Sequence, residues 1–77
     1  MAAKSYVLIE TEVGRASEVA QGVQKLEGVR SADTIAGAYD VLATIHAADL
    51  DAVGTVIKQM HSISGICKTT TLIAMRF

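Results

Sequence analysis

The sequence contains very little cysteine. Cys67 is the only one among 77 residues, so no disulfide can form within the chain and no cysteine pair can begin a structural zinc site. His46 and His61 do not stand at ligand-pair spacing either. We therefore predict no metal or other cofactor. A lone cysteine is typical of a reducing interior, and we expect a cytoplasmic location.

Aromatic residues and net positive charge are also scarce. Tyr6, Tyr39 and Phe77 are the only aromatic side chains, and the formal net charge is −1. Neither a stacking platform nor a basic surface for nucleic acid is expected. No apolar run approaches the roughly 20 residues that span a bilayer. The N-terminal segment MAAKSYVLIETE reaches acidic residues too early for a signal peptide.

Hydrophobic residues are abundant for so short a chain. They make up 51% of the sequence, whereas charged residues make up 19%. A domain of this size buries only about 60% of the surface of its unfolded chain, so its stability is marginal. Without disulfides or metal, oligomerisation is the remaining common source of stability.

The spacing of the apolar residues predicts four strands and two helices. The strands are residues 5–12, 29–36, 39–47 and 66–75. The first helix follows the turn VGRAS and ends before Gly28, and the second is capped by Asp49 and ends at Ser64–Gly65. The residues at helical spacing are Ala16, Val19, Ala20, Val23 and Leu26 in the first helix and Leu50, Ala52, Val53, Val56, Ile57 and Met60 in the second.

The two halves of the chain repeat one another. Gly28-Val29 precedes a threonine-hydrophobic pair by six residues, and Gly65-Ile66 does the same. Each half therefore reads as strand, helix, strand, with a right-handed crossover. Two such units interleave into an α+β, ferredoxin-like βαββαβ sandwich, in which both helices cover one face of a four-stranded antiparallel sheet. We expect one domain over residues 1–77.

The face of this sheet away from the helices should be polar, but it is not. Whichever alternation meets the helices, the open face keeps Tyr6, Leu8, Leu42 and Leu72. At ~25 cal/mol per Å², leaving these side chains in water forgoes several kcal/mol. We predict that they form the interface of a homodimer of the dimeric α+β barrel type, with two sheets packed face to face.

The segment GAYDV, residues 37–41, places a carboxylate directly before an apolar strand. Asp40 can be a turn residue that satisfies local backbone donors beside Gly37. It can also accept a hydrogen bond from an ammonium group, while free N–H groups of the Gly37-Ala38 turn meet a carboxylate. A turn that offers both would suit an α-amino acid.

The remaining reactive side chains favour structural roles. His46 is expected to be a solvated strand residue, and His61 to complement the dipole at the end of the second helix. Cys67 is expected to pack, because no base is evident nearby. The alternating hydroxyls of residues 69–71 favour a strand and can line a small polar pocket. No nucleophile–base–orienter set is present.

Two segments, GAYDVLATIHAADLD and SGICKTTTLIAM, resemble the effector-binding domain of the Lrp/AsnC, or feast/famine, transcription factors, which is also called the RAM domain. The resemblance covers nearly the whole chain. The matching positions are Gly37, Tyr39 and Asp40 in the turn and Gly65, Ile66, Thr69 and Thr71 in the final strand.

This resemblance implies a non-enzymatic module that binds amino acids, dimerises through its sheet and assembles into rings, commonly of eight subunits. The implied ligand-binding residues are Gly37, Ala38, Tyr39, Asp40, Thr71, Thr69 and Thr34. Family members usually carry an N-terminal helix-turn-helix domain, for which this sequence leaves no room. We therefore expect a stand-alone form without direct DNA binding, which can co-assemble with full-length relatives.

Two other classes of protein share the predicted topology. A small dimeric ferredoxin-like enzyme, of the monooxygenase or isomerase kind, needs a deep cavity with a fixed His, Asn or Trp, and this chain has no Asn and no Trp. An ACT-like regulatory domain would bind a similar ligand at side-by-side helices or sheet edges. A ligand between dimers would favour the Lrp/AsnC interpretation.

Overall fold

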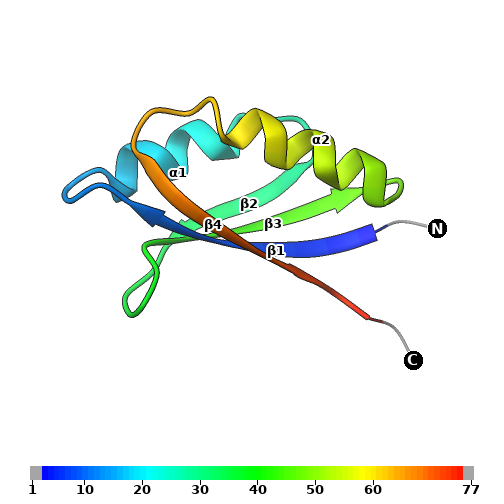
Figure 1. Ribbon diagram of the computed structural model, residues 1–77, viewed down its shortest axis with the longest axis horizontal. Coiled ribbons are helices and arrows are strands. Elements are labelled where there is room, and N and C mark those ends of the chain that lie inside the picture. The colour runs from blue at the N-terminus through cyan, green and yellow to red at the C-terminus, as the bar shows by residue number, and fades with distance from the viewer. Residues whose placement is uncertain (1–2, 76–77) are drawn as a thin grey trace.

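Six elements follow one another in the order that the repeat predicts. The computed structural model describes residues 3–75, with β1 (Ala3–Thr11), α1 (Ala16–Gln24), β2 (Val29–Thr34), β3 (Val41–Ala47), α2 (Leu50–Met60) and β4 (Ile66–Ile73). The antiparallel sheet has the order β2-β3-β1-β4. Both helices lie on one face of it (Figure 1). The predicted ferredoxin-like α+β fold is confirmed.

Strict alternation in the two central strands produces the core. Val7 and Ile9 of β1 are completely buried on the helix side of the sheet, together with Val41, Ala43 and Ile45 of β3. The helices bury three residues each against this surface: Val19, Ala20 and Val23 from α1 and Val53, Val56 and Met60 from α2. The core is therefore a single layer between the sheet and two short helices.

The predicted elements are correct in type, but most of their ends are displaced. β1 begins two residues earlier than predicted, α1 ends at Gln24, and α2 ends at Met60 rather than at Ser64–Gly65. The reason is that Leu26 and Ile63 pack against the core from the turns after the helices, so their hydrophobicity extends the helical pattern without extending the helix.

The strand ends show a similar difference. β2 ends at Thr34, β3 begins only at Val41, and β4 ends at Ile73, because the turn between β2 and β3 takes residues 35–40. Leu50, one of the apolar residues at helical spacing in the predicted second helix, is not part of the core, since 60% of it is exposed. The buried side of α2 is centred on Val53, Val56 and Met60, and Leu50 lies outside it.

Two local signals in the sequence act as predicted. The Asp49 carboxylate caps α2, because its Oδ1 accepts a hydrogen bond from the Ala52 N–H at 2.8 Å. Gly28 has a φ of +94°, and a Cβ at this position would lie 2.8 Å from Cγ2 of Val56. Only glycine therefore lets the turn after α1 approach α2 so closely.

The open face of the sheet carries the four large side chains assigned to it. Tyr6 pairs with Leu72 across β1 and β4, and Leu8 pairs with Leu42 across β1 and β3. Half of Leu72 is exposed, and the Lys4 ammonium lies 5.4 Å from the centre of the Tyr6 ring. These residues form one continuous apolar strip on the face opposite the helices; its role as a dimer interface stays a prediction. Neither helix of the described chain has the length and apolarity needed to cross a membrane.

One residue of the core has the wrong polarity. Ser5 is completely buried on the helix side of β1, between Ile45 and Ile73 in the sheet register. Its hydroxyl is a buried side-chain polar atom without a hydrogen-bond partner among the described residues. An unsatisfied buried polar group costs about 1–3 kcal/mol of stability.

Replacement of Ser5 should therefore stabilise the domain. We expect Ser5→Ala to raise the free energy of unfolding by about 1 kcal/mol, or the melting temperature by about 4–8 °C. Thermal unfolding followed by circular dichroism measures this change, with Ser64→Ala at an exposed loop position as the control. A lower melting temperature for Ser5→Ala would show that the hydroxyl has a partner.

Candidate ligand-binding site at the turn between β2 and β3

The turn between β2 and β3 projects from one end of the molecule. Its ends are held together by a hydrogen bond from the Ile35 N–H to the Asp40 carbonyl oxygen, at 2.9 Å. Gly37 has a φ of +137°, and no atom lies within 4 Å of the position of a Cβ there. The glycine is thus required by the backbone conformation and not by crowding. Gly37 and Ala38 are exposed, whereas Tyr39 and Asp40 are half-buried.

Asp40 anchors this turn to the central strand. Its carboxylate Oδ2 accepts a hydrogen bond from the Thr11 N–H at 2.8 Å, and its own N–H donates to the Ile9 carbonyl oxygen at 2.9 Å. Thr11 follows a register shift at the end of β1, where a backbone N–H needs a new partner. Asp40 therefore has the role of a turn residue that satisfies a backbone donor. A carboxylate has about four acceptor sites, so this one hydrogen bond leaves most of them free.

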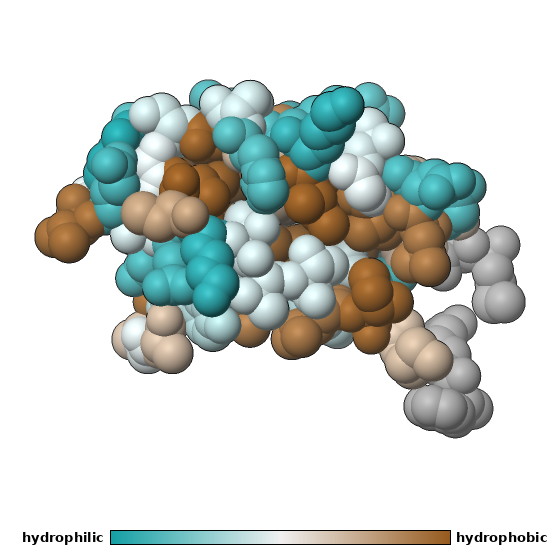
Figure 2. All heavy atoms as spheres, viewed as in Figure 1, coloured by the Kyte–Doolittle hydropathy of each residue, from teal (hydrophilic) through white to brown (hydrophobic). Residues whose placement is uncertain are grey.

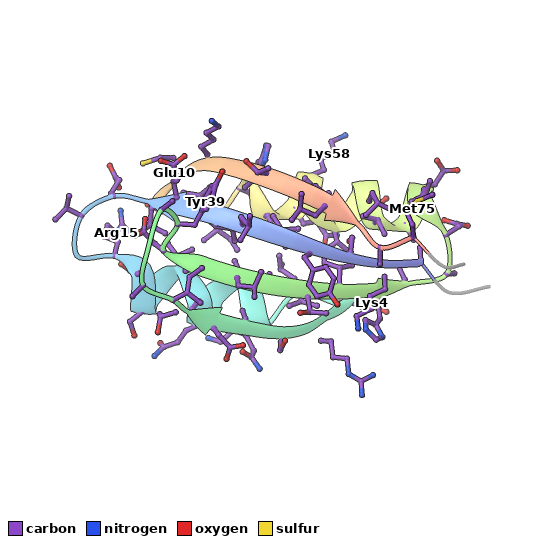
Figure 3. The ribbon with its side chains drawn as sticks, turned by 90° about the horizontal axis from the view of Figure 1, so that it is seen from below. Lys4, Glu10, Arg15, Tyr39, Lys58 and Met75 are labelled. Carbon is purple, nitrogen blue, oxygen red and sulfur yellow. The ribbon has the colours of Figure 1, made fainter. Side chains whose placement is uncertain are left out.

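A second charged group lies at the same end of the molecule. The Arg15 guanidinium pairs with Glu12 at 2.9 Å and with Glu18 at 3.0 Å. The hydrogen bond that Arg15 Nε donates to the Glu18 carboxylate raises the pKa of Arg15 and lowers the pKa of the Glu18 carboxyl. Figure 3 shows Arg15, Tyr39 and Glu10 at this end and Lys4 at the other.

Gly65 connects this ion-pair group to the last strand. Its carbonyl oxygen accepts a hydrogen bond from the Glu12 N–H at 2.8 Å. A Cβ on Gly65 would lie 3.0 Å from Val19 Cγ2 and 3.2 Å from the guanidinium of Arg15, and its φ is +100°. Gly65 therefore holds the loops of this end in place, and its part in the sequence motif is structural.

The threonines predicted for the site fall into two groups. Thr34 pairs with Val41 directly beside the turn, whereas Thr69 and Thr71 lie on β4 at the other edge of the sheet, next to Ile9 and Val7. Two strands lie between β2 and β4, so the groups are roughly 14 Å apart at a strand spacing of about 4.8 Å. One chain does not bring all seven predicted residues into a single pocket.

The remaining reactive side chains lie elsewhere. His46 is exposed at the end of β3, as predicted. His61 is the C-cap residue of α2, and its Nε2 lies 3.0 Å from Oγ1 of Thr69. The expectation that Cys67 packs is wrong, because Cys67 is exposed; its side chain lies on an edge strand that the helices leave largely uncovered.

Open grooves lie beside both helices. One of about 520 Å³ lies between α1 and β2 and includes Thr34 in its wall. The other, of about 300 Å³, lies beside α2 and is lined by His46, Glu27 and Gln59 together with several alanines. Among residues 3–75 no three His, Cys, Asp or Glu side chains are grouped so that they could hold a metal ion.

The sequence reasoning missed the supporting residues of this end. Glu12, Arg15 and Glu18 follow one another at intervals of three, a spacing that permits ion pairs where the chain turns into a helix, and that signal could have identified them. The role of the Thr11 N–H as a donor to Asp40 could not have been identified from the sequence. This N–H lacks a partner in the strand ladder because of the register shift at the end of β1.

Comparison with known proteins gives a consistent result. Residues 4–77 match the family model described as the Lrp/AsnC ligand binding domain. An uncharacterized HTH-type transcriptional regulator from Pyrococcus furiosus is 34% identical over 58 residues, which are 74% of this chain and 39% of the regulator. The chain thus spans well under half of that relative.

Solved structures show the same fold. A protein from Thermus thermophilus is 26% identical and superposes with a TM-score of 0.91. The match covers 97% of this chain and 95% of the Thermus chain. A transcriptional regulator from Neisseria meningitidis, solved as a complex with L-Met, is 19% identical and superposes with a TM-score of 0.80. The match covers 96% of this chain and 50% of the Neisseria chain. From the family model and the Pyrococcus relative together, the chain belongs to the Lrp/AsnC ligand-binding domain family.

Proposed function

We propose that this domain is a regulatory, non-enzymatic module that binds an α-amino acid at the turn between β2 and β3. The observation that carries this proposal is the Asp40 carboxylate, which is fixed at an exposed glycine turn and has acceptor sites left. The family to which the chain belongs is one of ligand-binding domains of regulators. The Neisseria regulator, which has the same fold, was solved with L-Met.

The turn has the two kinds of group that an α-amino acid needs. The ammonium group would donate to the free oxygen of Asp40, which the Thr11 N–H holds in a fixed orientation. The carboxylate of the ligand would accept hydrogen bonds from the backbone N–H groups of Gly37 and Ala38, both of which are exposed. Tyr39, half-buried in the same turn, offers an aromatic surface to the side chain of the ligand.

The site is incomplete in one chain. Thr69 and Thr71 lie at the opposite sheet edge from Thr34, so they can contribute only to a site that another subunit closes. We therefore place the ligand between subunits of an oligomer, with the turn from one subunit and β4 from another. Binding would then depend on assembly, and assembly on binding.

Substitutions of Asp40 test this site. A screen of α-amino acids by thermal shift identifies the strongest ligand, and calorimetry then measures its affinity. Because a hydrogen bond to a charged group contributes about 1.5–3 kcal/mol, we expect Asp40→Asn to weaken binding by about tenfold to a hundredfold. Asn retains an acceptor for the Thr11 N–H, so the melting temperature should change little, whereas Asp40→Ala should lower it.

Asp51→Asn provides the control for loss of one negative charge, since Asp51 lies in the first turn of α2 and outside the proposed site. The affinity of Asp51→Asn for the amino acid should equal that of the unchanged protein. Undiminished binding by Asp40→Asn, or a screen in which no amino acid raises the melting temperature, would contradict the proposed site.

The apolar strip on the open face is the proposed dimer interface. Tyr6, Leu8, Leu42 and Leu72 lie together there, and an exposed apolar patch of this kind is characteristic of a protein contact. The helices cover the other face, so a second copy of the same face is the simplest cover. Rings of such dimers, and co-assembly with full-length relatives, are part of this proposal.

A lysine in the strip should separate the dimer. We expect Leu42→Lys to lower the mass found by light scattering at micromolar concentration by half or more, because a charge would be buried in the interface. Val13→Lys serves as the control, since Val13 is fully exposed at the loop after β1. A monomeric mass of the unchanged protein would refute the interface.

Direct contact with DNA is not part of the proposed function. The net charge of −1 provides no excess of cations for phosphates. We expect no specific complex between this chain and duplex DNA at low salt in a gel-shift titration. A tight, sequence-specific complex would contradict this part of the proposal and would indicate a DNA contact made by the domain itself.

A further inference from the structure

The groove between α1 and β2 has polar walls that the proposed function does not use. Its volume is about 520 Å³, within the range of about 300–1,000 Å³ that is typical of small-molecule sites. It lies along β2, at the opposite edge of the sheet from β4. Figure 2 shows the side of the molecule with α2 and β4, where hydrophobic side chains are exposed. The α1–β2 groove is bordered instead by polar residues, among them Ser17, Gln21, Gln24, Lys25 and Thr34.

Two alanines form the floor of the α1–β2 groove. Ala20 of α1 is 7% exposed and Ala32 of β2 is 8% exposed, and both line the groove. Their short side chains leave space between the helix and the strand that larger residues would fill. The floor is therefore apolar, whereas the side chains around it are polar.

The hydrogen bond at the β2 edge fixes the orientation of the Gln24 amide. Its Oε1 accepts from the Ala32 N–H at 3.2 Å, and only the oxygen of a side-chain amide can accept a hydrogen bond. The Nε2 group, which has two N–H donors, is therefore directed away from this bond. Among residues 3–75 these two donors have no hydrogen-bond partner. The amide thus presents free donors at the groove.

Lys25 adds a positive charge beside this amide. It follows Gln24 at the end of α1, is exposed, and lines the same groove. The ion pairs within the described part of the chain are both made by Arg15, so Lys25 has no anionic partner there. A cation and N–H donors that lie together are the groups that bind a carboxylate through charge-assisted hydrogen bonds.

The acidic residue that borders the groove does not neutralise Lys25. Asp33 pairs with Leu42 in the register of β2 and β3, and Leu42 stands on the open face. Side chains of directly opposite residues share one face of a sheet, so the Asp33 carboxylate lies on the face away from α1. Asp33 therefore contributes its backbone to the groove, and the charge at the groove is that of Lys25.

The other end of the groove offers hydroxyl groups. Thr34 pairs with the buried Val41, so its side chain lies on the helix side of the sheet. Ser17 lies in the first turn of α1, and both hydroxyl residues line the groove. Ser17 and Gln24 are seven residues apart, or about 10 Å along the helix. The groove therefore has a cationic end and a neutral polar end, separated by the length of a short carbon chain.

We propose that the α1–β2 groove binds a small organic acid, whose carboxylate lies between the Lys25 ammonium and the Gln24 Nε2 group. The carbon chain of the acid lies over the two alanines, and a polar group at its other end meets the two hydroxyls. An ammonium group finds no carboxylate in this groove, so acids without an ammonium group bind better than α-amino acids. This is a second site, separate from the turn, because Asp40 does not line the groove.

An NMR titration of the unchanged chain with glutarate tests this site. Glutarate has a carboxylate at each end of a short carbon chain, so one carboxylate can bind at Lys25 while the other reaches the hydroxyls. We expect saturable shifts of the Gln24 side-chain NH₂ signals and of the Lys25, Ala32 and Thr34 amide signals. Glutaramide has nearly the same shape without the charge, and it should bind more weakly by about tenfold or more.

Two substitutions separate recognition of the anion from the fold. Lys25→Gln removes the cation, and Gln24→Glu retains an oxygen for the Ala32 N–H but replaces the two donors with a second oxygen. We expect each variant to weaken glutarate binding by about tenfold or more and to leave the melting temperature nearly unchanged. Lys58→Gln and Gln59→Glu make the same changes on α2, outside the groove, and should retain full affinity.

Several results would overturn the proposal. Equal binding of glutarate and glutaramide would show that the groove does not recognise the charge, and equal binding of inorganic phosphate would indicate an adventitious ion only. Undiminished binding by Lys25→Gln, or the absence of saturable shifts, would also contradict the site. Asp40→Asn should bind glutarate as well as the unchanged protein does, so failure at the groove and failure at the turn are distinguishable.

Discussion

The alternation of the two central strands is the constraint on which the rest of the molecule depends. From Ser5 to Ile9 in β1 and from Val41 to Ile45 in β3, the side chains toward the helices are small or β-branched and apolar, apart from Ser5, and all of them are buried. Because side chains in a strand alternate, the large residues Tyr6, Leu8 and Leu42 must then stand on the opposite face. Two short helices suffice for the first face, and nothing in the described chain covers the second. The exposed apolar face is therefore a direct consequence of how the core is built.

The end of the molecule that carries the β2–β3 turn is organised by backbone hydrogen bonds more than by packing. Asp40 holds the Thr11 N–H, and Gly65 receives the Glu12 N–H. The ion pairs of Arg15 brace the same loops. An exposed turn fixed in this way can present polar groups to a ligand with little loss of conformational entropy on binding. The same residue thus has a structural bond and free acceptor sites, and the two interpretations of Asp40 do not exclude each other.

The surfaces of the molecule differ in how far the chain itself covers them. One face of the sheet packs against α1 and α2, which have open grooves beside them, the other face is apolar, and β4 pairs with a strand on one side only. At the β2 edge, the Gln24 Oε1 accepts a hydrogen bond from the Ala32 N–H at 3.2 Å.

The sequence by itself determined the order of the six elements, the ferredoxin-like topology, and the residues of the open face, because each of these follows from local periodicity and a short repeat. It also supplied a turn at Gly37-Ala38, which in the structure extends over residues 35–40, and the cap at Asp49. It misplaced the ends of α1 and α2, because Leu26 and Ile63 pack from the turns and hydrophobicity alone cannot distinguish a turn from a helix.

Only the tertiary structure decided that Asp40 bonds to Thr11, that Thr34 and Thr69 lie at opposite edges of the sheet, and that Cys67 is exposed. These facts depend on strand register and strand order. They link residues that are distant in the chain, and no local pattern in the sequence records which of them become neighbours.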